Sequence, residues 1–160
     1  MDLSMMMKRK KQYTSTIMQY SIPPCFYRLS VKALILNEEG KIFLVQDELG
    51  NWELPWGGLE HGEKIEDCIR REILEETWMN VTIVPWEPEY CITCIFNGKN
   101  KVNIPIVNII YKVEVDRFCF APKEECIDGK FFEYIEAKNL PQSNHTQEFL
   151  EKYNPKNHVH

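Results

Sequence analysis

Three glutamates near the middle of the sequence have the residue type and spacing of a ligand set for a hard metal ion. They are Glu72, Glu75 and Glu76, in the segment RREILEETW. Residues three and four apart share one face of an α-helix, so a helix here would bring the carboxylates together. Mg²⁺ and Mn²⁺ prefer carboxylate and water oxygens. We therefore expect these three acids to bind a divalent cation.

The direction in which the acids face separates a metal site from an ordinary solvated helix. At about 100° per residue, Glu72 and Glu76 each fall about 20° from Ile65, inside the apolar stripe of the helix. A solvated helix would place them opposite that stripe. Buried carboxylates are costly and repel one another unless a cation neutralises them. The pattern therefore favours a metal site.

A glycine-bearing loop, PWGGLEHGE, directly precedes the acidic segment. Gly57 and Gly58 allow tight backbone turns and close approach of a ligand. Such a loop can direct main-chain carbonyls at a metal and main-chain N–H groups at phosphate oxygens. Plain turns use glycine as well, but next to the acidic segment we interpret Gly57 and Gly58 as cofactor-binding residues.

Loop and acidic segment together resemble the signature of the Nudix hydrolase family (MutT-like), G-x5-E-x7-R-E-U-x-E-E-x-G-U, where U is a bulky aliphatic residue. Eight of the nine fixed positions match over 23 residues, from Gly57 to Met79. The mismatch is Trp78, where the family has glycine. The resemblance implies an α/β (α+β) fold, an α/β/α sandwich with a mixed β-sheet flanked by helices.

The resemblance also implies a metal-dependent hydrolase with Mg²⁺ (or Mn²⁺) as cofactor. Its substrate would be a small nucleoside diphosphate-linked molecule, such as a nucleoside triphosphate, a damaged nucleotide or a nucleotide sugar, cleaved at the pyrophosphate linkage. A bound divalent ion would polarise the phosphoryl oxygens and lower the pKa of its water. Two alternatives stay open: hydrolysis at a triphosphorylated or capped RNA 5′ end, and a Nudix-fold nucleotide-binding module with impaired turnover.

Further roles follow from the resemblance. Trp56 would offer its main-chain carbonyl to the metal, while its indole either stacks on a base or blocks the entrance. Arg71 would orient an acid such as Glu63 through paired hydrogen bonds, the alternative being a surface ion pair of little energetic weight. The general base would be Glu72, or an acid of the loop PKEEC, Glu125 or Glu124, unless those two are solvated loop charges.

Trp78 bears on how the helix ends. A glycine just past a helix often adopts a positive φ, which other residues resist by about 1–2 kcal/mol. Asn80 tolerates that conformation and could end the helix instead.

The hydrophobic pattern predicts the elements that must position this site. Strands are predicted over 27–36, 41–46, 51–54, 81–84, 89–96, 101–115 and 130–135, and helices over 64–77 and 145–153. The turn NGKN indicates a hairpin between the two longest strands, and Pro105 indicates an edge or a bulge there. This order predicts a mixed sheet flanked by helices.

Composition limits the classes of partner. A length of 160 residues favours one domain, which we expect over 21–160 after a flexible N-terminal tail over 1–20. The net charge of -5 argues against a broad basic surface for duplex nucleic acid. No apolar stretch is long enough to span a membrane and no secretory signal is evident. We therefore expect a cytoplasmic protein with a small nucleotide substrate and no membrane partner; a homodimer is an open possibility.

Cysteines and aromatic residues give weaker signals. The C-x-x-C of Cys91 and Cys94 fits a redox pair or half of a zinc site, but nothing completes such a site, so small apolar fillers in a strand are favoured. Four aromatic residues could stack on a nucleobase, although core or strand packing is favoured for each: Tyr27, Phe43, Trp52 and Trp86.

Overall fold

The computed structural model of the chain describes residues 27–97, 103–122 and 126–158. The tail predicted over 1–20 and most of the NGKN turn lie outside the described residues. The division of the chain into a tail and a single domain therefore stays a prediction.

The central feature is a four-stranded mixed sheet in the order β4-β1-β7-β6. β1 runs parallel to β7, whereas β4 pairs with β1 and β6 pairs with β7 in antiparallel orientation. A three-stranded sheet has the order β3-β2-β9, and β5 pairs with β8. The strands are β1 (Arg28–Leu34), β2 (Ile42–Gln46), β3 (Trp52–Glu53), β4 (Trp56–Gly58), β5 (Val81–Ile83), β6 (Tyr90–Asn97), β7 (Asn103–Lys112), β8 (Glu114–Val115) and β9 (Asp128–Phe132).

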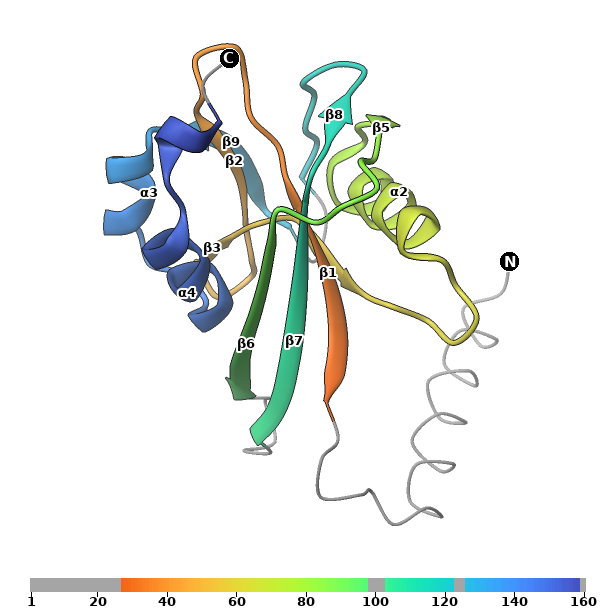
Figure 1. The fold of residues 1–160 in the computed structure, drawn as a ribbon. Helices are drawn as coiled ribbons and strands as arrows, with labels where there is room; N and C mark the ends of the chain where they lie inside the picture. The colour runs from red at the N-terminus through yellow and green to blue at the C-terminus, as the bar shows by residue number, and fades with distance from the viewer. Residues whose placement is uncertain (1–26, 98–102, 123–125, 159–160) are drawn as a thin grey trace.

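Helices cover the strands from opposite sides, as Figure 1 shows. On one side lies α2 (Ile65–Thr77), and on the other lie α3 (Tyr134–Asn139) and α4 (Asn144–Lys152), followed by the short 3-10 helix η1 (Pro155–Asn157). Two hydrophobic clusters fill the layers, one under α2 and the other under α3 and α4. The predicted fold class, a mixed sheet between helices, is confirmed.

Besides the short η1, two elements were not predicted from the sequence. β4 forms where a loop was expected, because Gly57 and Gly58 pair with Val31 and Ser30 of β1 despite the low strand propensity of glycine. α3 forms where the last strand was expected to continue to residue 135. A capping box at Glu133 starts this helix, and a carboxylate accepting the first free N–H groups favours a helix over a strand.

Pro105 occupies a local edge of the sheet. The first residue of β1, Arg28, pairs with Ile106, so within the described part of the chain β7 has a hydrogen-bonded neighbour at Pro105 only in β6. The pairing of β6 with β7 continues without a register shift. The predicted edge is therefore confirmed, and the predicted bulge is not present in this pairing.

The C-x-x-C does not form a joint site. Cys91 and Cys94 lie three residues apart in β6, and side chains at odd spacing in a strand point to opposite faces. Cys91 is exposed and Cys94 is half-buried, and both are free thiols. The interpretation as an apolar filler is therefore wrong for Cys91.

The C-terminal end of α2 is formed by Trp78 and not by Asn80. Trp78 has φ 65 and ψ 10, in the left-handed region, and its N–H donates to the carbonyl of Leu74 at 3.1 Å. Among the described residues it is the only non-glycine with positive φ. Asn80 instead bonds Asp116 through its main chain and its side chain. The prediction that Asn80 ends the helix in place of the missing glycine is therefore wrong.

We predict that Trp78→Gly raises the free energy of unfolding by about 1 kcal/mol, because glycine adopts positive φ without the clash between Cβ and the carbonyl. Chemical denaturation measures the change. Trp86→Gly is the matched control, since Trp86 is 94% exposed and has no positive φ. A loss of stability in Trp78→Gly would show that contacts of the indole outweigh the backbone strain.

Candidate metal site and active site

The acidic face of α2 is set by the residues that anchor the helix. Ile69 and Ile73 are 3% and 1% exposed and pack in the cluster beneath α2. This packing turns Glu72 toward the protein, leaving its side chain only 18% exposed. Glu76 accepts a hydrogen bond from the main-chain N–H of Trp56 at 3.0 Å. The predicted inward direction is confirmed for Glu72 and Glu76.

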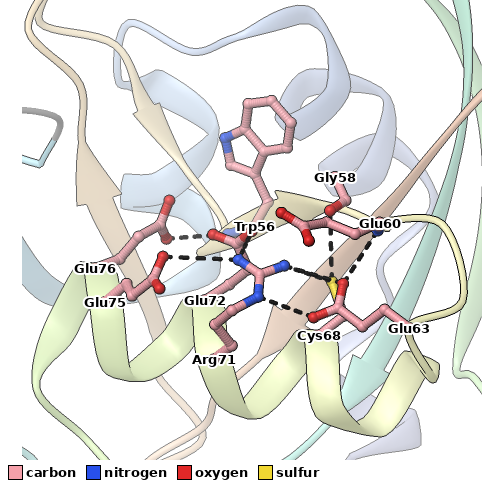
Figure 2. Close-up of polar contacts among 9 residues, drawn as sticks. All are labelled: Trp56, Gly58, Glu60, Glu63, Cys68, Arg71, Glu72, Glu75 and Glu76. Carbon is pink, nitrogen blue, oxygen red and sulfur yellow. Dashed lines mark hydrogen bonds and ion pairs between the residues drawn. The ribbon is translucent and has the colours of Figure 1, made fainter. Parts of the chain in front are cut away.

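Glu75 lies differently from the other two acids. Its side chain is 62% exposed, and one carboxylate oxygen lies 3.6 Å from the guanidinium of Arg71. Figure 2 shows Glu72, Glu75 and Glu76 on adjacent turns of α2, with the Trp56 indole extending away from the helix. The helix therefore presents two acids to β4 and one to its outer side.

Gly57 permits the close approach of α2 to β4. A Cβ atom added at this position would lie 1.9 Å from the carboxyl carbon of Glu72. Since no such contact is tolerated, only glycine leaves room for the Glu72 carboxylate against the strand. At Gly58 the nearest atom to an added Cβ belongs to Arg28, at 2.7 Å, and not to an acid. Of the two glycines, Gly57 is the one that shapes the acidic site.

Arg71 organises the carboxylates around it. Its Nε and Nη2 donate to the two oxygens of Glu63 at 2.8 and 3.0 Å, and its Nη1 donates to Glu72 at 2.6 Å. The predicted paired hydrogen bonds to Glu63 are confirmed. A planar guanidinium held by one carboxylate at two points fixes the position of its third nitrogen. Arg71 therefore orients Glu72 (Figure 2).

Burial makes the acids of the site unlike ordinary glutamates. Burial raises the pKa of Glu76 well above its usual value, against the effect of the Trp56 N–H, while Glu53 and Glu72 raise it further. Burial also raises the pKa of Glu72, although Arg71 opposes this. A buried acid that is costly to ionise gains most from a cation at its oxygens.

The donor set fits a hard divalent cation, although no ligand cluster is already gathered. Among the described residues, no group of three or more His, Cys, Asp or Glu side chains is arranged to hold a metal. Glu72 is bound to Arg71 and Glu76 to the Trp56 N–H, so both carboxylates already have partners. Oxygen donors without nitrogen or sulfur ligands suit Mg²⁺ or Mn²⁺.

The Trp56 indole has a role that the sequence did not indicate. Its ring centroid lies 4.6 Å from the ammonium nitrogen of Lys32 and 5.9 Å from the guanidinium carbon of Arg28. The ring of His145 from α4 lies at 5.8 Å. Burial, together with the positive charge of Lys32, lowers the pKa of His145 to about 3, so this imidazole is neutral near pH 7.

Lys32 and His145 were missed as site residues. Lys32 interrupts the apolar strand segment LSVKALIL, and a lysine within a buried strand is a rare event that could have been recognised as a signal. His145 carried no comparable signal, because a histidine near the start of a polar helix is ordinary.

Other candidate residues lie elsewhere. Glu124 and Glu125 lie outside the described residues. Phe43 and Trp52 are buried in the two clusters, as core packing predicts. Tyr27 and Trp86 are 54% and 94% exposed and lie outside the strands, so for these two the interpretation as core or strand packing is wrong.

Comparison with known proteins identifies the family. A family model described as NUDIX domain matches residues 26–153. The chain belongs to the Nudix family. The fold resembles a MutT protein from Methanosarcina mazei Go1, with a TM-score of 0.70, 19% identity, and coverage of 86% of this chain and 99% of that chain. A MutT Nudix hydrolase from Burkholderia pseudomallei gives a TM-score of 0.68 at 20% identity, covering 81% and 99%.

Curated relatives match over a shorter segment. An RNA pyrophosphohydrolase from Wolbachia sp. subsp. Brugia malayi (strain TRS) is 38% identical over 52 residues, which is 31% of this chain and 32% of the relative. The chain thus matches about a third of the length of this relative. Nudix hydrolases generally use divalent metal ions, in agreement with the acidic face of α2.

We predict that Arg71→Lys weakens Mn²⁺ binding by about 10–100-fold, because a lysine cannot hold Glu63 at two points and still fix Glu72. Calorimetric titration with Mn²⁺ measures the effect. Arg70→Lys is the matched control, since Arg70 forms its ion pair with Glu66, on the helix side away from the acids. Equal Mn²⁺ affinity in both variants would remove Arg71 from the support of the site.

Glu76 should also make the stability of the metal-free protein depend on pH. Its folded-state pKa is raised, so its contribution to stability is present at low pH and is lost as the pH rises from about 4.5 through the folded value. Glu76→Gln, which retains an oxygen for the Trp56 N–H, should therefore gain stability over the wild type as the pH is raised. Thermal unfolding in chelator at about pH 5 and pH 8 measures this. A pH-independent difference, or the same trend in the exposed Glu75→Gln, would contradict it.

Proposed function

We propose that this protein is a metal-dependent Nudix pyrophosphohydrolase, cleaving the pyrophosphate linkage of a small nucleoside diphosphate-linked substrate. The observation that carries the proposal is the buried Glu76 carboxylate, which accepts a hydrogen bond from the Trp56 N–H. Glu72 lies beside it, in the space that Gly57 leaves open. A structural glutamate pair would gain nothing from such burial, whereas metal ligands are held in this way.

Glu72, Glu76 and the main-chain carbonyl of Trp56 are the proposed ligands of Mg²⁺ or Mn²⁺, with Glu75 sharing a second ion. The N–H and C=O of one strand residue point to the same side. Because the Trp56 N–H reaches Glu76, this geometry supports a ligand role for its carbonyl. The bound ion would neutralise the pyrophosphate and lower the pKa of attacking water.

The chain's own residues then position the reaction. Arg71 keeps Glu72 turned toward β4 through its hold on Glu63. The main-chain N–H of Gly58 is the proposed contact for phosphate oxygens, because it points to the same side of β4 as the Trp56 N–H, whereas the N–H of Gly57 points toward β1. Glu72, with its raised pKa, is the proposed general base, with Glu125 as the alternative.

A triphosphorylated RNA 5′ end is the second candidate substrate. Its support is that several curated relatives carry the name RNA pyrophosphohydrolase, from Wolbachia and from Bartonella clarridgeiae. The net charge of -5 counts weakly against it, since an RNA end requires only a local basic groove. A nucleotide-binding module without turnover is the remaining alternative.

We propose that the enzyme acts in the cytoplasm. We propose no membrane partner and no duplex nucleic-acid partner for it. Among the described residues, no helix combines the length and apolar character that crossing a bilayer requires. A homodimer is a separate hypothesis, tested by light scattering of the intact chain.

Activity on a substrate panel tests the proposal. Nucleoside triphosphates, nucleotide sugars and a triphosphorylated RNA oligonucleotide are incubated with Mg²⁺ or Mn²⁺, and released phosphate or pyrophosphate is measured. We expect turnover that stops in chelator and falls at least about 100-fold in Glu76→Gln. Glu66→Gln, on the solvent side of α2, serves as the control. Binding without product on every substrate would favour the binding module.

A further inference from the structure

A row of buried polar side chains crosses the sheet beside the acidic site. Ser30, Lys32 and Asn108 are 0%, 1% and 1% exposed. Ser30 pairs directly with Asn108 in the β1–β7 register, and Lys32 lies two residues further along β1. Residues two apart in a strand share a face, so all three project to the same side of the sheet. The proposed pyrophosphohydrolase mechanism gives none of them a role.

Lys32 supplies hydrogen-bond donors that the described residues do not use. Its ammonium lies against the Trp56 ring at 4.6 Å, and no described residue accepts a hydrogen bond from it. Burial lowers its pKa, while Glu53 and Glu76 oppose this by their negative charge. A lysine this deeply buried is costly unless its donors find acceptors, which points to a bound molecule that offers them.

Asn108 supplies a hydrogen-bond acceptor. Its side-chain amide nitrogen donates to the thiol sulfur of Cys94 at 3.2 Å, which leaves the oxygen as the end of the amide without a partner among the described residues. The hydroxyl of Ser30, opposite Asn108 on β1, is likewise without one. The row therefore offers a donor at Lys32, an acceptor at Asn108 and a hydroxyl between them.

The row is within reach of the acidic site. β1 and β7 are the first and second neighbours of β4, roughly 5 and 10 Å away at the usual strand spacing. A hollow of about 570 Å³, of the size of small-ligand sites, lies between β6, β7 and α4. Cys94, which receives the bond from Asn108, lines this hollow. The hollow therefore adjoins the row at Asn108, while the row itself lies on the two strands nearest to β4.

The mixture of donor and acceptor distinguishes a nucleobase from a phosphate. A phosphate offers only acceptors and would face the Asn108 oxygen unfavourably. A base edge offers both kinds of group. Guanine and thymine carry a carbonyl acceptor where adenine and cytosine carry an amino donor, and the ring nitrogen next to that carbonyl bears a hydrogen. A carbonyl with a neighbouring N–H matches Lys32 and Asn108.

We propose that Lys32 and Asn108 bind the base of the substrate and select keto bases, such as guanine, hypoxanthine and uracil, over the amino bases adenine and cytosine. The inference rests on the proposed function for the identity of the substrate as a nucleotide. Lys32 donates to the base carbonyl, and the Asn108 oxygen accepts from the adjacent ring N–H. An amino base presents a donor to the ammonium and a bare ring nitrogen to the amide oxygen, so both contacts are lost.

Hypoxanthine and adenine nucleotides provide the sharpest test. The two bases differ only in the carbonyl or amino group and in the hydrogen on the neighbouring ring nitrogen. We expect kcat/KM for inosine triphosphate to exceed that for adenosine triphosphate by about 10–100-fold in the wild type. In Lys32→Met, which keeps the length of the side chain, this ratio should fall toward one. Lys41→Met is the matched control, because Lys41 pairs with Glu39 at the surface, and it should keep the wild-type ratio.

A binding measurement separates this inference from the proposed hydrolysis. Calorimetry with inosine and adenosine monophosphates in chelator needs neither turnover nor metal, and it should show tighter binding of the inosine compound, with the preference lost in Lys32→Met. Hydrolysis without base preference would overturn the inference and leave the proposed function standing. Preferential binding of the inosine compound without hydrolysis of any substrate would overturn the proposed function and leave the inference standing. A preference unchanged in Lys32→Met, as expected if an internal water satisfies the row, would also overturn the inference.

Discussion

The close approach of α2 to β4 is the constraint on which the whole site depends. The buried isoleucines of α2 hold the helix against the sheet, and Gly57 leaves the volume that the Glu72 carboxylate occupies. One turn later, Glu76 reaches the main-chain N–H of Trp56. Packing thus brings two carboxylates into a region of low polarity. The low polarity raises their pKa values and makes a cation the natural partner of both.

Arg71 balances part of this negative charge without removing it. Glu63 occupies two of its nitrogens, so one nitrogen remains to hold Glu72. Lys32 belongs to β1 and Glu76 to α2, and their opposite charges influence each other across β4. The acidic site and the buried lysine are therefore electrostatically linked through β4, with the Trp56 ring covering the ammonium.

The strained end of α2 is held in place by its neighbours. Thr77 donates to the carbonyl of Ile73 at 2.5 Å and accepts from the N–H of Met79 at 3.2 Å. Met79 is fully buried, and Asn80 is fixed to Asp116 by main-chain and side-chain bonds. These contacts on both sides force Trp78 into the left-handed region, because the chain must turn directly after the helix to bury Met79. A strained conformation persists when the surrounding contacts determine it.

Much of the site followed from the sequence. The spacing of Glu72 and Glu76 relative to the isoleucines predicted their inward direction, and the family signature predicted the pairing of Arg71 with Glu63. The strand pattern and the position of α2 were predicted as well, because periodicity reports which face of an element is buried. These are local properties, written within one or two turns of a helix or a few residues of a strand.

Only the tertiary structure decided which segments meet. β4 exists because its glycines pair with β1, whereas local propensity favoured a loop. The left-handed turn at Trp78 and the placement of Trp56 over Lys32 depend on contacts between elements distant in sequence. A sequence pattern specifies the face that an element buries, but not the partner against which it is buried. The row of Ser30, Lys32 and Asn108 could therefore be recognised only once β1 and β7 lay side by side.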